Sequence, residues 1–380
     1  MPRLMSTQED EESLLHQQVR GHWRGHLYVA VGAAVLNSVT FGMSIGYTSP
    51  ALPDIRKRIA FSDIQGDWFG SLHNVGAAMG APAAGGLMQA FGRRDTILFS
   101  AMGYLTGYLC IQALPHPELL FVGRFLAGIS SGMISVAVPV FISEISPPRS
   151  RGAINMTFPL TSAFGILLIY VLGKWLDYTW LATVCMLPPT LSALLLPWVA
   201  KSPRWLLQVS RTEDARNALV YYVGKHDAVE ELTTISSTID DCSKCQVAEL
   251  RLSHVLKPFL CTLLAMFIQR FSGVGVLLFY AEDIFKSAGS TVDPADSAII
   301  TGTVQLVCMS AAGVTIDKLG RRKMLMFSLA ICCVCLAFFG AFFRLKQVLS
   351  PSFGNDYGWL PLASLCLFMF GYSYGVGPLP

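Results

Sequence analysis

Two turns in this sequence carry paired arginines, Gly92-Arg93-Arg94 and Gly320-Arg321-Arg322. An arginine guanidinium can bind a carboxylate through two parallel hydrogen bonds, and it can also donate to the free carbonyls at a helix C-terminus. Acidic residues occur in turns of the same kind, so the pattern predicts a charge latch that joins helix ends. The expected members of this latch are Arg93, Arg94, Glu144, Arg151, Arg204, Asp317, Arg321 and Arg322.

Covalent chemistry is not indicated. The sequence shows no Ser/His/Asp set, no metal-ligand cluster and no nucleotide loop, and Gly273-Val-Gly275 lacks the strand and helix that a phosphate cradle needs. We therefore expect neither enzymatic activity nor a cofactor or metal. The net charge of +3 is too small to suggest a nucleic-acid partner.

The first arginine turn belongs to a segment that is repeated. Residues 83–100 read AAGGLMQAFGRRDTILFS, and residues 311–328 read AAGVTIDKLGRRKMLMFS. In both copies an apolar run rich in small residues enters the Gly-Arg-Arg turn and another apolar run leaves it. Two parallel copies of a helical unit around a midplane site are typical of transporters.

The elements that must position these turns are membrane spans. Apolar residues make up 53% of the 380 residues, charged residues only 14%, and the mean hydropathy is +0.50. Continuous apolar runs, rich in Gly and Ala, predict ten transmembrane helices rather than alternating strands. The predicted spans are 27–49, 66–91, 96–114, 119–142, 152–173, 179–199, 258–281, 297–317, 324–343 and 358–380.

Lys and Arg accumulate in the tail, in both arginine turns and in the loop 200–257, which predicts a cytoplasmic amino terminus. The same rule offers another reading of the latch arginines, namely that they only mark the cytoplasmic side. We favour the latch because Glu144 and Asp317 are acidic residues in otherwise basic turns. The basic triplet Arg56, Lys57 and Arg58 falls on the opposite side and is the one local exception.

The spans divide the chain into a tail (1–26), six spans (27–199), a cytoplasmic linker (200–257) and four spans (258–380). Within the linker, Thr212 to Tyr222 is expected to be helical. If the second half repeats the first, two further spans follow residue 380. In the tail, Asp10, Leu14 and Leu15 fit the acidic dileucine pattern read by endocytic sorting adaptors, the alternative being a solvated acidic tail. We expect a multi-pass protein of the plasma membrane, with endosomes as the alternative.

From about Tyr28 onward the chain resembles the sugar porter family of the major facilitator superfamily, which includes facilitative glucose transporters and insect trehalose transporters. The motifs that carry the resemblance are Gly92-Arg93-Arg94, Gly123-Arg124, Pro139-Val-Phe-Ile-Ser-Glu144, Ser202-Pro203-Arg204-Trp205, Gln269 with Phe271-Ser272-Gly273, Asp317-Lys318-Leu-Gly320-Arg321-Arg322, and Gly375-Val-Gly377-Pro378. The resemblance implies an all-α major facilitator fold of two parallel six-helix bundles, the second one truncated in this chain. It also implies a small-molecule sugar as the transported partner.

The resemblance places a sugar site between the halves, near the bilayer midplane. The candidate residues are Gln269, Arg270, Tyr280, Gln305, Tyr372, Gly377 and Pro378. The resemblance itself implies four of them, Gln269, Tyr280, Gln305 and Tyr372. The two glutamine amides can both donate and accept, which suits the hydroxyls of a sugar, although hydrogen bonding between helices would explain them equally well. The break at Gly377-Pro378 is expected to let the last helix bend.

Several positions depart from the hexose-carrier pattern. Arg270 replaces a second Gln, Gly275 an Asn, Pro159 a Gln, Gln89 an Asp and Lys201 a Glu. Pro159 and the segment 47–52 look more like trehalose transporters, so a disaccharide is a plausible cargo. Arg270 inside a span opens the alternative of an anionic sugar derivative.

Proton-driven relatives carry an Asp shortly after a Phe-Gly pair in the first span, where this chain has Phe41-Gly42-Met43-Ser44. A serine hydroxyl does not titrate in this range. We expect facilitated downhill transport by alternating access, with the latch biasing the two states. The alternatives are a sugar sensor that does not transport and an inactive fragment.

Overall fold

The structure, a computed structural model, describes residues 25–378 apart from 60, 114, 148–149, 225–227, 229–230, 238–252, 289–291 and 350–358. The dileucine residues Asp10, Leu14 and Leu15 lie outside these residues. Throughout the described part of the chain the regular structure is helical. Seven of the described helices are long and apolar enough to cross a membrane, in agreement with the all-α membrane fold expected from the sequence.

The first half consists of the helix Gly25–Gly46, α2 (Thr48–Arg58), α3 (Asp63–Ala90), α4 (Arg93–Ala113), α5 (Pro117–Ile145), α6 (Arg151–Asn155), α7 (Thr157–Gly173), α8 (Tyr178–Leu195) and the short η1 (Leu196–Trp198). The predicted spans of this half fall on these helices, although 27–49 reaches into α2, 152–173 covers α6 and α7, and 179–199 covers α8 and η1. The longer α3 begins at a capping box, in which Ser62 and Gln65 each accept from the other's backbone N–H.

Small residues let α3 and α5 approach closely. A Cβ atom on Gly80 would lie 2.0 Å from the carbonyl oxygen of Ile129, and one on Gly132 would lie 2.2 Å from that of Ala77. Membrane helices have no water-driven force between them, so they associate through such close backbone packing. The Gly- and Ala-rich composition of the spans therefore has a direct structural use.

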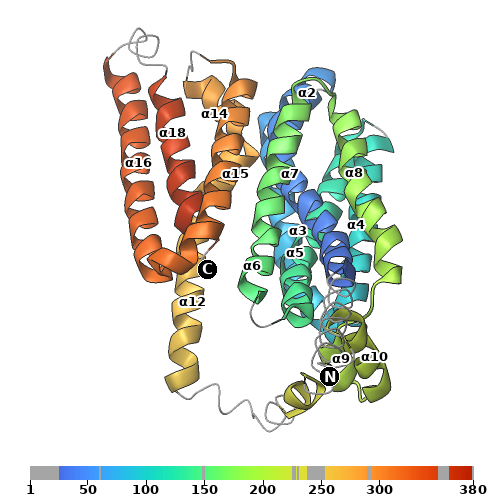
Figure 1. The fold of residues 1–380 in the computed structure, drawn as a ribbon. Helices are drawn as coiled ribbons and strands as arrows, with labels where there is room; N and C mark the ends of the chain where they lie inside the picture. The colour runs from blue at the N-terminus through green and yellow to red at the C-terminus, as the bar shows by residue number, and fades with distance from the viewer. Residues whose placement is uncertain are drawn as a thin grey trace, which may run out of the picture.

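Between the halves, α9 (Pro203–Gln208) and α10 (Thr212–Tyr222) lie at one end of the helices, together with the start of the described chain (Figure 1). The bounds of α10 match the helix expected from the sequence. We call this the loop end of the molecule. The opposite end, where α2 and α14 lie, is the far end (Figure 1).

The second half consists of α12 (Ser253–Phe271), α13 (Val274–Phe279), α14 (Ala281–Ala288), α15 (Pro294–Leu319), α16 (Arg321–Leu349), α18 (Leu360–Gly371) and the π-helical turn η3 (Tyr372–Val376). Figure 1 draws these helices, in yellow to red, as a group beside the blue-to-green helices of the first half. The helices α7 and α15 pack together where the two groups meet. The domain boundaries at 199 and 257 stay predictions.

The predicted span 258–281 is not one continuous helix. Gly273 has φ +82°, a left-handed conformation that separates α12 from α13, and Tyr280 separates α13 from α14. The apolar run extends across both interruptions, so hydropathy alone did not reveal them. The last predicted span, 358–380, also changes form, because α18 passes into the π-turn η3 before Gly377.

Candidate functional site

The first arginine turn forms ion pairs inside the first half. Arg93 at the start of α4 lies 2.8 Å from Glu144 near the end of α5, and both side chains are almost buried. Ser202, which caps α9, donates to the other oxygen of Glu144. Arg93 also donates to the side chain of Gln208 in α9. One carboxylate therefore joins α4, α5 and α9.

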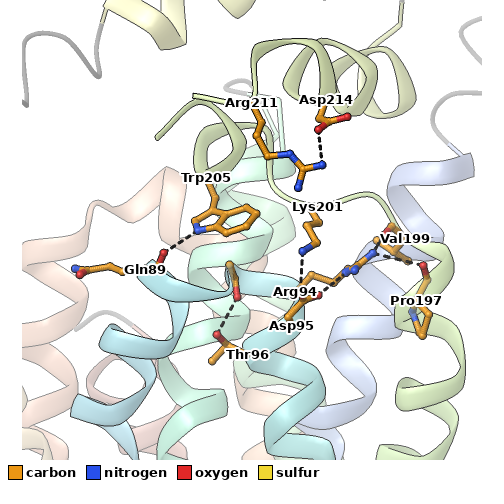
Figure 2. A network of polar contacts seen from close by, with 11 residues as sticks. Gln89, Arg94, Asp95, Thr96, Pro197, Val199, Lys201, Trp205, Arg211 and Asp214 are labelled. Carbon is orange, nitrogen blue, oxygen red and sulfur yellow. Dashed lines mark hydrogen bonds and ion pairs between the residues drawn. The ribbon is translucent and has the colours of Figure 1, made fainter. Parts of the chain in front are cut away.

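A second carboxylate, Asp95, was missed in the sequence analysis. It accepts from Arg94 at 2.8 Å and from Lys201 at 2.7 Å (Figure 2). Arg94 in turn donates to the backbone carbonyl of Val199 at 2.9 Å. Lys201 stands where the family pattern has Glu, and the structure supplies a reason for the departure, because the partner at Asp95 is acidic.

Trp205 of α9 also contributes to this network (Figure 2). Its indole N–H donates to the carbonyl of Gln89 at 3.0 Å, and its ring lies 4.9 Å from the ammonium of Lys201. A Cβ on Gly92 would approach the Trp205 ring to 2.9 Å, and Gly92 has φ +93°. Glycine is therefore required at position 92, because the backbone has a positive φ there and because a side chain would clash with the Trp205 ring.

The remaining latch residues are placed differently. Arg151, Arg204 and Arg322 form no ion pair with another described residue, and Arg322 is exposed. The side chains of Asp317 and Arg321 lie outside the described residues. The ion pairs seen here connect elements of the first half and the linker, so a latch that responds to the movement of the halves stays a prediction.

Several residues that were expected at the sugar site lie around the π-turn η3. The side-chain amide of Gln269, in the last turn of α12, donates to the carbonyl oxygens of Val376 and Gly377, both at 2.9 Å. Ser328 of α16 donates to Gly371 and accepts from the Val376 N–H. These side chains supply hydrogen-bond partners to backbone groups in η3 and on either side of it.

Gln305 lies on a buried polar face of α15. Ser297, Thr301, Gln305 and Met309 follow one another at one-turn spacing and are all buried. Met309 contacts Gly377, because a Cβ on that glycine would lie 3.4 Å from its methyl carbon. Gln305 Oε1 has no hydrogen-bond partner among the described groups. This face of α15 therefore presents an unpaired acceptor beside the break that Gln269 holds.

Tyr372 and Pro378 flank the same break. The Tyr372 ring stacks on Phe368 at 6.3 Å, and its Cε1 atom would lie 3.2 Å from a Cβ on Gly377. Pro378 is half-buried directly after Gly377. Arg270, next to Gln269, is exposed, and its charge acts on the Tyr372 hydroxyl. The structure thus brings Gln269, Tyr372, Gly377 and Pro378 together, with Gln305 and Arg270 near them.

Tyr280 is the member that the structure places elsewhere. Its hydroxyl donates to the carbonyl of Asp67 in α3 at 3.3 Å and lies against Gly70. It therefore joins the two halves rather than lining the η3 break. On the sequence it follows Gln269 closely, but the breaks on either side of α13 redirect the chain.

Two further polar groups, Tyr170 and Arg124, were assigned no role from the sequence, although Arg124 belongs to one of the family motifs. Tyr170 of α7 donates to the Leu278 carbonyl of α13 at 2.6 Å, across the halves. Arg124 of α5 is fully buried and donates to the Ser44 carbonyl and the Thr48 hydroxyl. A charged residue inside a predicted span is a signal that could have singled out Arg124, whereas nothing local marks Tyr170.

The family profile described as "Sugar (and other) transporter" matches residues 18–380. The chain is 32% identical to mouse solute carrier family 2, facilitated glucose transporter member 8, over 98% of this chain and 81% of the relative. It is also 32% identical to the facilitated trehalose transporter Tret1 of the honeybee Apis mellifera ligustica, over 98% of this chain and 76% of the relative.

Solved structures share the fold. A partially occluded inward-open conformation of the xylose transporter XylE from E. coli superposes with a TM-score of 0.77 at 20% identity, covering 93% of this chain and 85% of the other. The proton:xylose symporter XylE bound to 6-bromo-6-deoxy-D-glucose superposes with a TM-score of 0.79 at 21% identity, covering 93% and 81%.

Proposed function

This chain belongs to the sugar transporter family, and on that premise we propose that it carries a neutral sugar across a membrane by alternating access of its two halves. The observation that carries the proposal is Gln305 Oε1, a buried acceptor without a partner among the described residues, one helical turn from Met309, which lies near Gly377. Leaving such a group unpaired costs about 1–3 kcal/mol, and a sugar hydroxyl can supply the missing donor.

The polar groups around η3 divide into two roles. Gln269 uses its amide donor to hold the carbonyls of Val376 and Gly377, so only its own oxygen is left for a ligand. The side-chain oxygen of Gln305 has no hydrogen-bond partner among the described groups, so both of its lone pairs can accept from a ligand. We assign Gln305 and Tyr372 to direct contact with the sugar and Gln269 to support of the π-turn that shapes the site.

Gly275 bears on the size of the cargo. A Cβ at this position would meet nothing within 4 Å, so there is free space where the hexose-carrier pattern has an Asn, and we assign this space to the path of the sugar. A wider site accommodates a disaccharide as well as a hexose. The curated relatives are named for glucose and for trehalose, and we propose a hexose or a trehalose-like disaccharide as substrate.

Arg270 supports a second candidate, an anionic sugar derivative. Its exposed guanidinium adjoins Gln269 and forms no ion pair with another described residue. A carboxylate or phosphate on the sugar would bind such a group strongly. The neutral sugar remains the first proposal because the curated relatives are named for glucose and for trehalose, which are both neutral.

Downhill transport is supported by the surroundings of Arg124. Its guanidinium donates to the Ser44 carbonyl and the Thr48 hydroxyl and lies over the Tyr47 and Phe69 rings. Within the described residues no carboxylate pairs with it, so the site lacks the carboxyl group that the proton-driven pattern places after the Phe-Gly pair. A titratable side chain beside Ser44 is His73, whose Nδ1 lies 3.4 Å from the Ser44 hydroxyl.

The test is uptake into proteoliposomes that contain the purified chain. Labelled glucose, fructose, trehalose and an anionic sugar are offered one at a time, with and without an imposed pH gradient. We expect saturable uptake of a neutral sugar that stops at equal concentrations on both sides. Binding without uptake would identify a sensor, uptake of only the anionic sugar would favour the second candidate, and pH-driven accumulation would overturn the downhill mechanism.

A further inference from the structure

The basic triplet Arg56, Lys57 and Arg58 at the end of α2 was the exception to the accumulation of Lys and Arg on the cytoplasmic side. Two of its residues, Arg56 and Arg58, form ion pairs at the far end. Arg56 lies 3.3 Å from Asp283 of α14, across the two halves. Arg58 instead pairs with Asp54 and Asp177, both in the first half. The triplet therefore contains one arginine that bridges the halves and one that does not.

A second ion pair crosses the halves at the same end. Lys174, which follows α7, binds Asp296 in the first turn of α15. Within the described residues, Arg56–Asp283 and Lys174–Asp296 are the two ion pairs that connect the halves. In each pair the first half contributes the positive charge and the second half the negative one.

Neutral contacts lie next to these pairs. Ser49 of α2 accepts from the backbone N–H of Glu282 at 3.2 Å and is only 3% exposed. The Tyr170 and Tyr280 hydroxyls donate across the halves, to Leu278 and Asp67. At the loop end, by contrast, the ion pairs formed by described residues stay within the first half and the linker.

We propose that Arg56, Asp283, Lys174 and Asp296 form an outer clasp, a pair of positioning contacts that holds the far end closed and sets how often the transporter opens there. This inference rests on the proposed transport function for its role, but the clasp itself is a property of the two halves. The four residues do not contact the sugar site at η3.

The exposure of the clasp fits a contact that must open in every cycle. The side chains of Arg56 and Asp283 are 29% and 32% exposed, and those of Lys174 and Asp296 are 36% and 41% exposed. Ion pairs that reach water are weak and are screened by salt, so they bias an equilibrium without locking it. A buried ion pair in the same position would cost far more to separate.

The experiment measures opening directly. Ser49→Cys places a thiol in the closed far end of the full chain in proteoliposomes, and a membrane-impermeant maleimide labels it only when that end opens. Lys174→Glu puts two negative charges opposite each other, and the combination Lys174→Glu with Asp296→Lys restores an attractive pair. Arg58→Glu is the matched control, since it reverses an arginine of the same triplet that pairs within one half. The chain without Ser49→Cys gives the background from native cysteines.

We expect Lys174→Glu to raise the labelling rate about three- to tenfold, the charge swap to bring it back to within about twofold, and Arg58→Glu to change it by less than about twofold. Raising the salt from about 50 to about 500 mM should raise the rate of the unswapped chain. Equal rates for Lys174→Glu and the parent, no recovery in the swap, or an equal effect of Arg58→Glu would overturn the clasp.

Two further measurements keep the outcomes separate. Lys174→Gln removes the attraction without adding repulsion, and it replaces Lys174→Glu if that variant does not yield a monodisperse protein. Its labelling rate should lie between those of the parent and Lys174→Glu. Labelling needs no substrate. If the labelling rates of the clasp variants change as expected but the chain transports no sugar, the proposed function alone is refuted. Intact transport with labelling that ignores every clasp variant would refute the clasp alone.

Discussion

The side-chain nitrogen of Gln269 lies 2.9 Å from the carbonyl oxygen of Gly377, and this bond ties α12 to the end of the last described helix. The same nitrogen also reaches Val376, so a single amide holds both carbonyls exposed by the π-turn. The contacts at the end of η3 therefore involve a residue more than one hundred positions earlier in the chain.

Gln269→Ala should destabilise the protein and slow uptake together. The change leaves two carbonyls of the π-turn without a donor, at a cost of about 1–3 kcal/mol. Thermal unfolding in detergent and sugar uptake report the two effects. Gln112→Ala is the control, because Gln112 also makes an interhelical bond, to Thr183, but far from η3 in the chain. A Gln269 variant that loses uptake at full stability would show that this amide acts on the sugar instead.

Gln305→Leu should weaken sugar binding without lowering the stability of the protein. The substitution removes a buried acceptor that has no partner and keeps an apolar side chain of similar size, so we expect unchanged or slightly increased thermal stability. Sugar affinity should fall at least about tenfold, because one hydrogen bond to a hydroxyl is lost. Uptake with an unaltered KM would remove Gln305 from the site.

Gly275→Asn should reduce the transport of larger sugars relative to smaller ones. Since a Cβ there meets nothing within 4 Å, the larger side chain fits without displacing its neighbours, and the melting temperature should be unchanged. We expect the ratio of trehalose to glucose uptake, expressed as kcat/KM, to fall. Gly302→Asn offers a contrasting variant, because the Tyr170 ring lies 3.3 Å from the position of its Cβ. An unchanged ratio in a stable Gly275 variant would show that this opening does not face the substrate.

Lys201→Glu restores the residue usual in the family but should be harmful here. Its new carboxylate would face Asp95, which now binds Lys201 at 2.7 Å. The expected loss is about 1 kcal/mol, seen as a lower melting temperature. The swap of Lys201→Glu with Asp95→Lys should recover most of it. Failure of the swap to recover any stability would show that Lys201 acts through its contact with Trp205 rather than through Asp95.

Glu282 makes the far end sensitive to pH. Burial, with repulsion from Asp283 and Asp293 adding to it, raises the pKa of this carboxyl to about 7, and Lys57 opposes the shift. When the far end opens, water reaches Glu282 and its pKa should return towards the ordinary value. The closed state then binds more protons than the open one between these two pKa values, so falling pH favours closure in that window.

The Ser49→Cys labelling rate should therefore fall as the pH drops from about 8 to about 6. Glu282→Gln, which mimics the protonated form, should keep the rate low throughout. Comparing the two chains at each pH cancels the titration of the thiol itself. A pH response that persists in Glu282→Gln would assign the effect to another group.

Hydropathy alone determined most of the architecture. Lipid forces every backbone group to bond within its own segment, so a long apolar run can only be a helix, and the predicted spans all fall on helices. Local chemistry also identified the Gly92 turn and the helix Thr212–Tyr222, because their determinants lie within a few residues.

The tertiary structure decided which polar groups meet. Nothing near Lys201 in the chain indicates Asp95, nothing near Arg56 indicates Asp283, and the two breaks around α13 interrupt an apolar run whose hydropathy is continuous. Helices with similar lipid-facing composition can pack in many orders, and only close contacts of small residues and paired charges select one of them. The sequence therefore determined that the chain crosses the membrane as helices, and the packing of those helices decided that Gln269 donates to Val376 and Gly377 while Gln305 on α15 keeps an oxygen without a partner among the described groups.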